Sequence, residues 1–293
     1  MRTDYLIETT LHKLNPDLHS RYRSCVSTSL QMLSRYEGVF PDFTDHTSLH
    51  TLEIIDFCNS LMGSQISRLN AESLYVLLMG ALFHDVGMGV SEQDFERFLK
   101  ERNIQEKAPK TPEEIKNLIR SYHHELSGWY IRKYWELFDI PGEDYARAII
   151  QVCRGHRKVD LFDEKEYPSS FFVSENIPVP LPYLASLVRL ADEMDIAADR
   201  NFSFLYELDK LPNYHSKLVF SIHKSIHRIA LKDDHMLVQA SSSSEEVKAG
   251  IREVVEKLQN TLEYCRKAVA ERSSFSIEQA RVQLEWIDAE VAI

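Results

Sequence analysis

The chain has 293 residues, of which 44% are hydrophobic, enough for one large core or for a main domain with an appendage. Its formal charge of -11 argues against a general nucleic-acid coat protein, which would carry a basic surplus. Only 9 glycines and 10 prolines, together with frequent helix-forming residues, argue against a many-turned β architecture.

The cysteine pattern and the N-terminal sequence both predict a cytoplasmic protein. The four cysteines show no CxxC spacing, which predicts reduced thiols in a cytosolic protein and not a disulfide scaffold. The N-terminal stretch MRTDYLIETTLHKL lacks the apolar core of a signal peptide. The most apolar segment, residues 74–83, is too short to span a membrane. We therefore expect a cytoplasmic location and no membrane contact.

Apolar residues recur at helical spacing through most of the first 200 residues, with turn signals such as Pro141-Gly142 between the periodic segments. Helices are predicted over residues 20–35, 46–61, 70–85, 95–103, 115–138 with a break near Gly128, 143–156 and 183–199. Residues 160–182 combine prolines and aromatics without clear periodicity, so a long loop over the core is expected there.

The pattern changes after about residue 205. The stretch LVFSIHKSIHRIALKDDHMLVQA alternates around a Lys-Asp-Asp-His turn, which predicts two strands joined as a hairpin. Residues 245–271 have the pattern of one long charged helix, and residues 274–293 are predicted to form another. The expected fold class is mainly α: a helical core over residues 1–205 and a small α+β appendage, hairpin plus long helix, over residues 206–293.

Residues able to bind hard or borderline cations lie near the ends or inner faces of successive predicted helices. They are His50, the pair His84-Asp85, His123 with His124 beside it, His156 and Asp192. A helical bundle can bring one inward-facing ligand per helix to a common centre. Imidazole and carboxylate ligands suit Mn, Fe, Co, Ni, Zn or Mg, and the two oxygens of Asp85 could bridge two cations. Two cations about 3.5–4 Å apart can activate a bridging water and clamp a phosphoryl oxygen.

Five blocks in this order, HTLEII, ALFHDVGMG, RSYHHELSG, CRGHRKVDL and LVRLADEMDI, resemble those of the HD-domain metal-dependent phosphohydrolase superfamily over residues 38–200. The stretches FPDFTDHTSLH and RSYHHELSGWYI, and the appended hairpin and helix, are most similar to HD modules fused to chaperone-type (GHKL) ATPases. The resemblance implies an HD-domain helical bundle and hydrolysis of a nucleotide or other phosphoester by metal-bound hydroxide. It also implies a fused or partner ATPase domain.

The superfamily's metal ligands carry over to this chain by position. The resemblance implies a first divalent cation bound by His50, His84, Asp85 and Asp192. Asp85 would bridge to a second divalent cation, held with His123 and His156. The expected catalytic residues are Asp85, His123 and His124, with a histidine or a nearby arginine meeting the charge that develops on the leaving oxygen.

Two ligand positions have a competing neighbour. His46 lies one helical turn before His50 and faces the same way, so either could be the first ligand, and the apolar residues of HTLEII favour His50. His123 fits the third block better than His124, because the small residue Ser127 follows it by four. Asp195 is expected to orient a ligand histidine through its other ring nitrogen, or to cap a turn.

Substrate and reaction type are less constrained. Five cations fall close to the ligand positions and could bind substrate phosphates: Arg120, Arg154, Arg157, Lys158 and Arg200. Met88 follows HDVG where cyclic-dinucleotide phosphodiesterases of the superfamily usually carry lysine. One rival function is an HD-type nuclease on single-stranded nucleic acid, which the acidic balance disfavours. The other is a non-catalytic nucleotide-sensing module.

Overall fold

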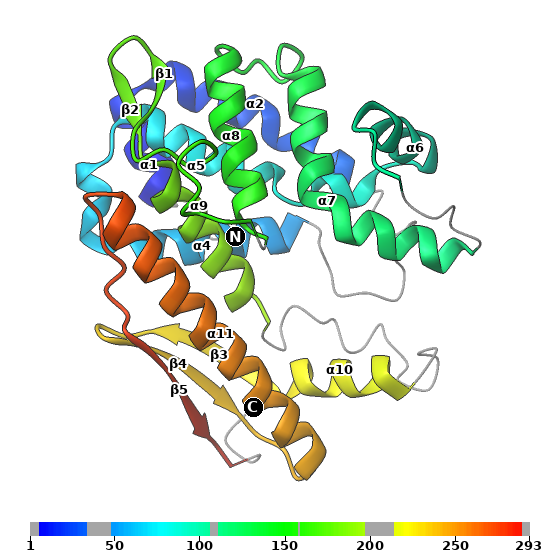
Figure 1. Ribbon diagram of the computed structural model, residues 1–293. Helices are drawn as coiled ribbons and strands as arrows, with labels where there is room; N and C mark the ends of the chain where they lie inside the picture. The colour runs from blue at the N-terminus through cyan, green and yellow to red at the C-terminus, as the bar shows by residue number, and fades with distance from the viewer. Residues whose placement is uncertain (1–5, 34–47, 106–110, 158, 197–213, 289–293) are drawn as a thin grey trace.

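The computed structural model describes residues 6–33, 48–105, 111–157, 159–196 and 214–288 (Figure 1). The first half contains α1 (Leu6–Leu14), α2 (Pro16–Leu33), α4 (Ser48–Met62), η1 (Gly63–Arg68), α5 (Ala71–Phe83) and η2 (Val86–Gly89). Helix α5 is central, since all its residues except Glu72 are buried. A helix that is apolar on nearly every side is stable in water only when it is buried on nearly every side. It begins where predicted, because the Asn70 side chain accepts a hydrogen bond from the Ser73 amide at 2.8 Å.

The other helices of the bundle are α6 (Glu92–Glu101), α7 (Pro112–Tyr134), α8 (Glu143–Gly155) and α9 (Leu181–Met194). Helix α7 runs unbroken through Gly128, so the predicted break is wrong. Glycine serves close packing there, because a Cβ on Gly128 would lie 3.0 Å from Cγ2 of Ile150 in α8. Helices α6 and α7 share a small apolar cluster that includes Phe98 and Trp129.

The predicted loop over residues 160–182 contains a short antiparallel hairpin, β1 (Phe171–Ser174) and β2 (Ile177–Val179). Pro178 lies opposite Phe172 in this pair. A strand with only one neighbour has a free edge, where a residue without an N–H is tolerated. Proline is therefore compatible with a strand here, and the loop prediction is corrected.

The C-terminal part contains α10 (Tyr214–Ser225), β3 (Ile226–Leu231), β4 (His235–Ala240), α11 (Glu245–Arg272) and β5 (Arg281–Trp286). The hairpin β3–β4 and the long helix agree with the prediction, but residues 218–225 are helical and not part of a strand. The predicted last helix is also wrong, because β5 pairs in parallel with β4 after the α11 crossover. Val282 and Leu284 are half-buried between exposed neighbours, which is the strand period.

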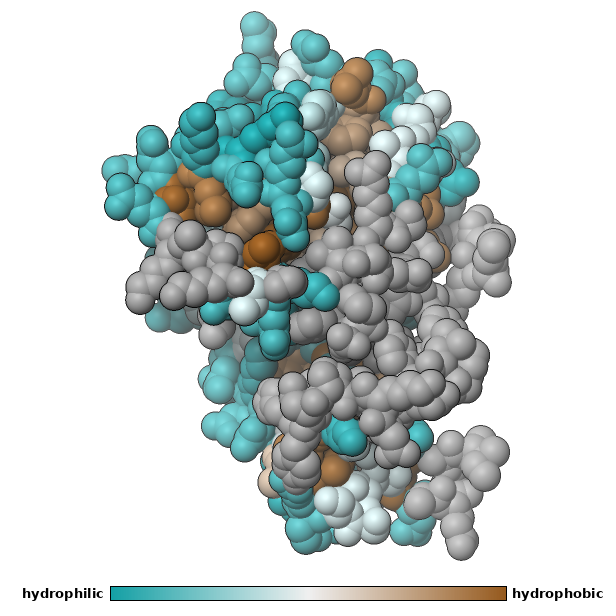
Figure 2. All heavy atoms as spheres, turned by 90° about the vertical axis from the view of Figure 1, so that its right-hand side faces the viewer, coloured by the Kyte–Doolittle hydropathy of each residue, from teal (hydrophilic) through white to brown (hydrophobic). Residues whose placement is uncertain are grey.

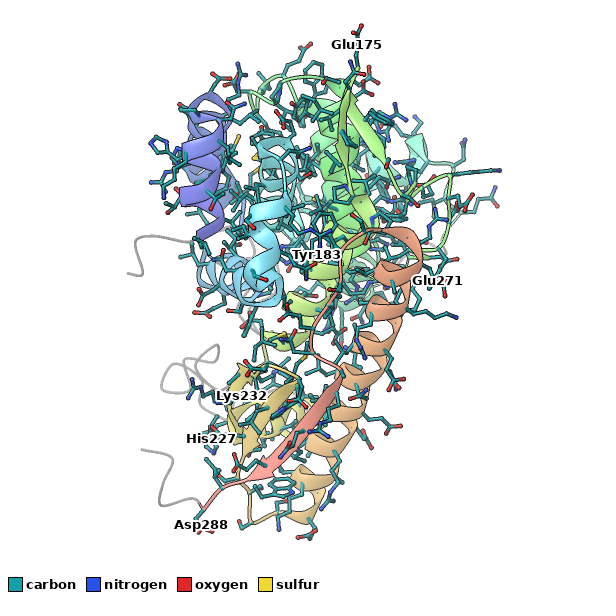
Figure 3. All side chains as sticks on the ribbon, turned by 90° about the vertical axis from the view of Figure 1, so that its left-hand side faces the viewer. Glu175, Tyr183, His227, Lys232, Glu271 and Asp288 are labelled. Carbon is teal, nitrogen blue, oxygen red and sulfur yellow. The ribbon has the colours of Figure 1, made fainter. Side chains whose placement is uncertain are left out.

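One apolar cluster runs from Ile7 in α1 to Ile277 beyond α11, so the two parts of the chain share a core. Tyr183 of α9 stacks on Phe275 with ring centroids 4.5 Å apart, and α11 rises from the sheet towards the bundle (Figure 3). The expected class, mainly α with a small C-terminal appendage, is confirmed. The boundary predicted at 205/206 lies outside the described residues.

The described surface is mixed in character. On the face shown in Figure 2, apolar side chains are visible in small areas between hydrophilic ones. Across the described residues, no single helix has both the length and the apolar composition to cross a membrane. Only the segment Ala71–Gly89 together with α6, bent by 107°, passes that test as a pair.

Candidate metal centre

Five helices bring the predicted ligand residues to one place inside the bundle. His50 lies in the first turn of α4, His84 and Asp85 follow α5, and His123 lies midway along α7. His156 caps the C-terminal end of α8, and Asp192 lies in the last turn of α9. The side chains of Asp192 and Asp85 are 17% and 4% exposed, and the four histidines are buried.

One group of ligand atoms gathers around Oδ2 of Asp85. His50 Nε2 lies 3.0 Å from His84 Nε2 and 3.5 Å from Asp85 Oδ2. His84 Nε2 lies 3.4 Å from the same oxygen. Asp192 also lies close to this group, with its Oδ1 3.5 Å from His50 Nε2 and 3.9 Å from His84 Nε2. His50, His84 and Asp85 could hold a metal ion, with Asp192 beside them.

A second group gathers around the other oxygen of Asp85. His123 Nε2 lies 3.2 Å from Asp85 Oδ1, and His156 Nε2 lies 3.7 Å from it. The two Nε2 atoms are 2.8 Å apart. Asp85 therefore divides its carboxylate between two histidine pairs, and the three residues of each group offer ligand atoms within 4.8 Å of one another.

The opposite ring nitrogen, Nδ1, is held by an acceptor in every one of the four histidines. His84 Nδ1 donates to the Ala81 carbonyl at 2.8 Å and His123 Nδ1 to the Arg120 carbonyl at 2.6 Å. His156 Nδ1 donates to the Cys153 carbonyl. Since carbonyl oxygens cannot donate, each of these rings must carry a proton on Nδ1. Neutral rings in this tautomer present the Nε2 lone pair to the centre, as metal-binding histidines do.

Lone pairs that face each other at 2.8 and 3.0 Å repel, unless a metal cation or a proton lies between them. Burial would lower the pKa of His84, but the carboxylates of Asp85 and Asp192 raise it to about 9. Burial and the proximity of His123 and His84 hold the pKa of His156 well below its usual value. The carboxylates of Asp85 and Asp192 thus favour a positive charge at His84. In the second group, His156 is a neutral imidazole, which is the form that binds metals.

The glycine after His84-Asp85-Val86 sets the approach of α7 to this centre. A Cβ on Gly87 would lie 2.1 Å from the His123 carbonyl oxygen and 2.8 Å from the Ser127 amide nitrogen. The Gly87 amide donates to Ser127 Oγ at 2.9 Å, and Ser127 Oγ donates to the His84 carbonyl at 2.8 Å. The end of α5 and the middle of α7 are thereby joined, which fixes His84 and His123 relative to Asp85.

Asp195 accepts a hydrogen bond from His50 Nδ1, which is the contact expected of a residue that orients this ring. Its side chain is 6% exposed. Replacing Asp195 with asparagine should weaken metal binding by about 10- to 100-fold, because His50 loses the charged acceptor that fixes its ring. Titration of the metal-free protein with Mn²⁺ or Zn²⁺, followed by calorimetry, measures this change. An unaltered affinity would contradict the role.

The two alternative ligands, His46 and His124, have different outcomes. His46 lies outside the described residues, as do Lys158 and Arg200. The His124 ring lies beside the second group, with its centroid 5.7 Å from that of His123 and 6.4 Å from that of His156. Its Nε2 lies 3.9 Å from Glu125 Oε1, and its buried Nδ1 has no hydrogen-bond partner among the described residues. Burial and the proximity of His123, Arg157 and Arg154 lower the pKa of His124 to about 3. The His124 ring is therefore neutral beside the second group.

Of the predicted phosphate-binding cations, Arg157 directly follows a candidate ligand, His156, in the sequence. It lines a groove of about 830 Å³ between the end of α8, α9 and α11, and His156 also borders this groove. Arg120 is exposed on α7, one turn before His123. His223, His227 and His235 lie in the C-terminal part, away from the ligand residues, and the side chain of His215 is outside the description.

Sequence reasoning missed Arg189, which is 7% exposed in α9. Its guanidinium donates to the carbonyls of Gly155 at 2.7 Å, Val159 at 2.8 Å and Arg157. These bonds hold the segment that carries His156. The available signal was a charged residue inside the apolar run LASLVRLA, since a buried arginine needs acceptors.

The HD-CE family model matches residues 40–291, which is most of the chain. The chain belongs to the HD-CE family. The match includes every ligand residue of both groups and continues through α11 and β5, so this HD-CE protein has an HD-like domain whose family pattern extends into the C-terminal sheet. Among curated proteins, none matches the chain.

Proposed function

We propose that this HD-CE protein is a metal-dependent phosphohydrolase or phosphodiesterase acting on a nucleotide or another phosphoester. The observation that supports this most is the shared Asp85 carboxylate. One of its oxygens faces His50 and His84, and the other faces His123 and His156. A bridging carboxylate between two imidazole pairs is a donor set for two divalent cations.

The spacing of the donors fits such cations. Bonds of about 2.1 Å place ligand atoms around one metal roughly 3.0 to 3.4 Å apart, from right-angled to tetrahedral geometry. Separations among His50, His84 and Asp85 are 3.0 to 3.5 Å, and those among Asp85, His123 and His156 are 2.8 to 3.7 Å. Asp192 would complete the first site. Bound Mn, Fe, Co, Ni, Zn or Mg would supply Lewis-acid polarisation of a phosphoryl oxygen and lower the pKa of water.

The chain's own residues would position the substrate. Arg157 borders the groove next to His156, where its guanidinium can bind phosphate oxygens through two N–H groups. Arg157, or the neutral His124, would meet the charge on the leaving oxygen. Arg120, Lys158 and Arg200 stay proposed substrate contacts. The same proposal includes three further properties. They are a cytoplasmic location, a fused or partner GHKL-type ATPase, and a helical core that ends near residue 205.

The test begins with the metal content of the purified chain, measured by elemental mass spectrometry. We expect near-stoichiometric transition metal, and its removal on a chelating resin should lower the melting temperature. Metal at 100 times its Kd should restore about 2.7 kcal/mol of stability. The reloaded protein is then assayed against mononucleotides, cyclic dinucleotides and single-stranded DNA.

The outcomes separate the candidate functions. Hydrolysis of nucleotides that depends on the added metal supports the proposal, whereas turnover of single-stranded DNA alone would replace it with a nuclease. Stabilisation by a nucleotide without any product would replace it with a sensing module. A chain that binds no metal under any of these conditions would overturn the metal centre itself.

A further inference from the structure

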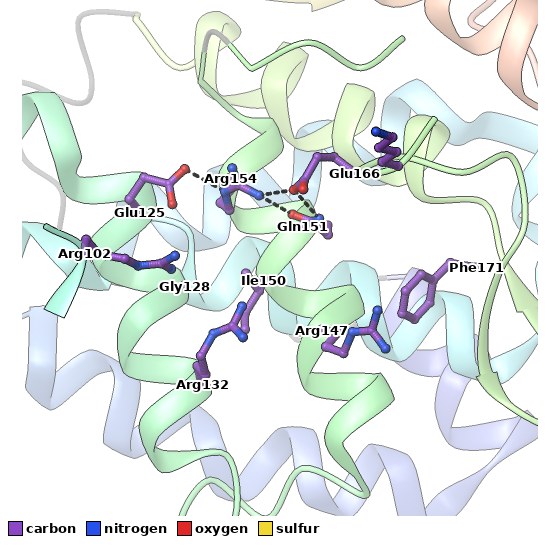
Figure 4. Close-up of a pocket in the computed structure, with 11 residues that line it drawn as sticks. Arg102, Glu125, Gly128, Arg132, Arg147, Ile150, Gln151, Arg154, Glu166 and Phe171 are labelled. Atoms are coloured by element: carbon purple, nitrogen blue, oxygen red, sulfur yellow. Dashed lines mark hydrogen bonds and ion pairs between the residues drawn. The ribbon is translucent and has the colours of Figure 1, made fainter. Parts of the chain in front are cut away.

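A second cavity lies away from the ligand atoms, on the outer side of α7 and α8 (Figure 4). Its volume is about 360 Å³, within the range of small-molecule pockets. The walls come from the end of α6, from α7 and α8, from the segment before β1, and from Phe171 of β1. Segments that are far apart in the sequence therefore converge on one opening.

Positive charge is concentrated around this cavity, although the whole chain carries -11. Its cationic side chains are Arg102, Arg132, Arg147, Arg154 and Lys165. Of the carboxylates in the described part of the chain, only Glu125 and Glu166 line it with them. Cations that converge from four segments repel one another, and a bound anion would relieve that repulsion.

The two carboxylates are already engaged by a single arginine. Arg154 Nε donates to Glu125 Oε1 at 2.7 Å, and its terminal nitrogen donates to Glu166 Oε2 at 2.5 Å. Gln151 donates to the same Glu166 oxygen at 2.8 Å. These hydrogen bonds lower the pKa of Glu166, so it stays ionised. Arg154, Glu125 and Glu166 together carry one net negative charge, against four remaining cations around the cavity. Figure 4 shows this network along one side of the cavity.

The other cations are left to face solvent in the opening. Within the described part of the chain, no carboxylate lies within ion-pair distance of Arg102, Arg132 or Lys165. Arg147 pairs with Asp144 at 3.1 Å, but both side chains are more than half exposed, and such pairs contribute little. The same guanidinium lies 5.4 Å from the centre of the Phe171 ring. The cavity thus combines unneutralised charge with an aromatic wall.

A glycine, which has no side chain, lies in the wall of the cavity between α7 and α8. Gly128 of α7 and Ile150 of α8 lie at the bottom of the opening (Figure 4). A Cβ on Gly128 would meet Ile150 Cγ2 at 3.0 Å and the Arg154 side chain at 3.9 Å. Glycine therefore keeps α7 and α8 close while leaving depth above their contact.

We propose that this cavity binds a multiply charged phosphate anion, at a site separate from the metal centre. Arginine forks bind phosphate oxygens in pairs, and several cations from different segments match several negative charges. The anion is either an inorganic polyphosphate or the phosphate chain of a nucleoside triphosphate, whose base would stack on Phe171. The site does not depend on the proposed hydrolase activity.

Binding is measured by calorimetry on the full chain, freed of metal on a chelating resin so that the metal centre cannot hold phosphate. The probes are inorganic tripolyphosphate and a non-hydrolysable nucleoside triphosphate. We expect saturable 1:1 binding that the double variant Arg132→Glu/Lys165→Glu weakens at least tenfold. Both positions are exposed, so the variant should melt at the wild-type temperature. Phe171→Ala should weaken only the nucleotide if the base is bound, and neither probe if the ligand is inorganic.

The matched control reverses the same amount of charge elsewhere. Lys248→Glu/Arg252→Glu changes two cations on the first half of α11, which do not line the cavity. This control should bind tripolyphosphate within about twofold of wild type once salt screens the distant charges. The proposal is overturned by any of three results: no saturable binding to wild type, an unaffected pocket variant, or an equal loss in the control.

Discussion

Replacing Gly87 with alanine is expected to destabilise the fold by about 3 kcal/mol or more, at the upper end of what overpacking costs. The added Cβ would lie 2.1 Å from the His123 carbonyl oxygen and 2.9 Å from Leu126 Cβ. Backbone inside a helix cannot rotate away as a flexible side chain does, so α7 has to move as a unit. Because His123 is on the contacted turn, the second metal group should be disrupted with the fold.

Urea denaturation and metal content, measured on the same preparation, test this expectation. Gly142→Ala is the matched control, since a Cβ there meets nothing within 4 Å and the backbone is extended, with φ of 179°. Gly142 is the N-cap of α8, where alanine is less favourable than glycine, so the unfolding free energy of this variant should fall by no more than about 1 kcal/mol. Wild-type stability and metal content in the Gly87 variant would show that α7 does not approach η2 this closely.

The helices of the bundle were predictable because their apolar period is local information. Helix α5 needed only its apolar run and Asn70 to be placed, and α11 only its charged periodicity. The strand β5 was not predictable in this way, since RVQLEW has few apolar residues and becomes a strand by pairing with β4. Tertiary pairing overrides weak local preference. The hairpin β1–β2 was hidden for a related reason, its proline being harmless only at an edge.

The candidate ligand residues could be named from the sequence, but their contacts could not. The family pattern favoured His50 over His46 and His123 over His124, while the orientation of His50, His123 and His156 depends on hydrogen bonds to Asp195 and to two carbonyl groups. Arg189 illustrates the limit, because its acceptors lie 30 and 34 residues away, at the end of α8 and in the segment after it. Long-range polar contacts of this kind leave no periodic trace in a sequence, and the same holds for the basic cavity.

Replacing Asp85 with asparagine should remove the second metal, weaken the first and reduce phosphoester hydrolysis by at least about 10³-fold. Among the described residues, Asp85 is the only one common to both candidate metal groups, and the electrostatic contribution of such metals would be several kcal/mol. The fold should survive, because the asparagine amide can donate to an Nε2 lone pair that the carboxylate could only repel. The variant should therefore melt close to the metal-free wild type and below the metal-loaded wild type.

Elemental analysis and calorimetric melting, run with and without added metal, measure both halves of this prediction. Asp288→Asn is the control, since it makes the same chemical change at an exposed site beyond β5. It should retain full metal content and activity. A folded Asp85 variant that binds two equivalents of metal would contradict the bridging role. A variant that loses metal but retains activity would show that catalysis does not need the metal. The reaction would then be assigned to other groups, foremost Arg157 and His124 near the groove.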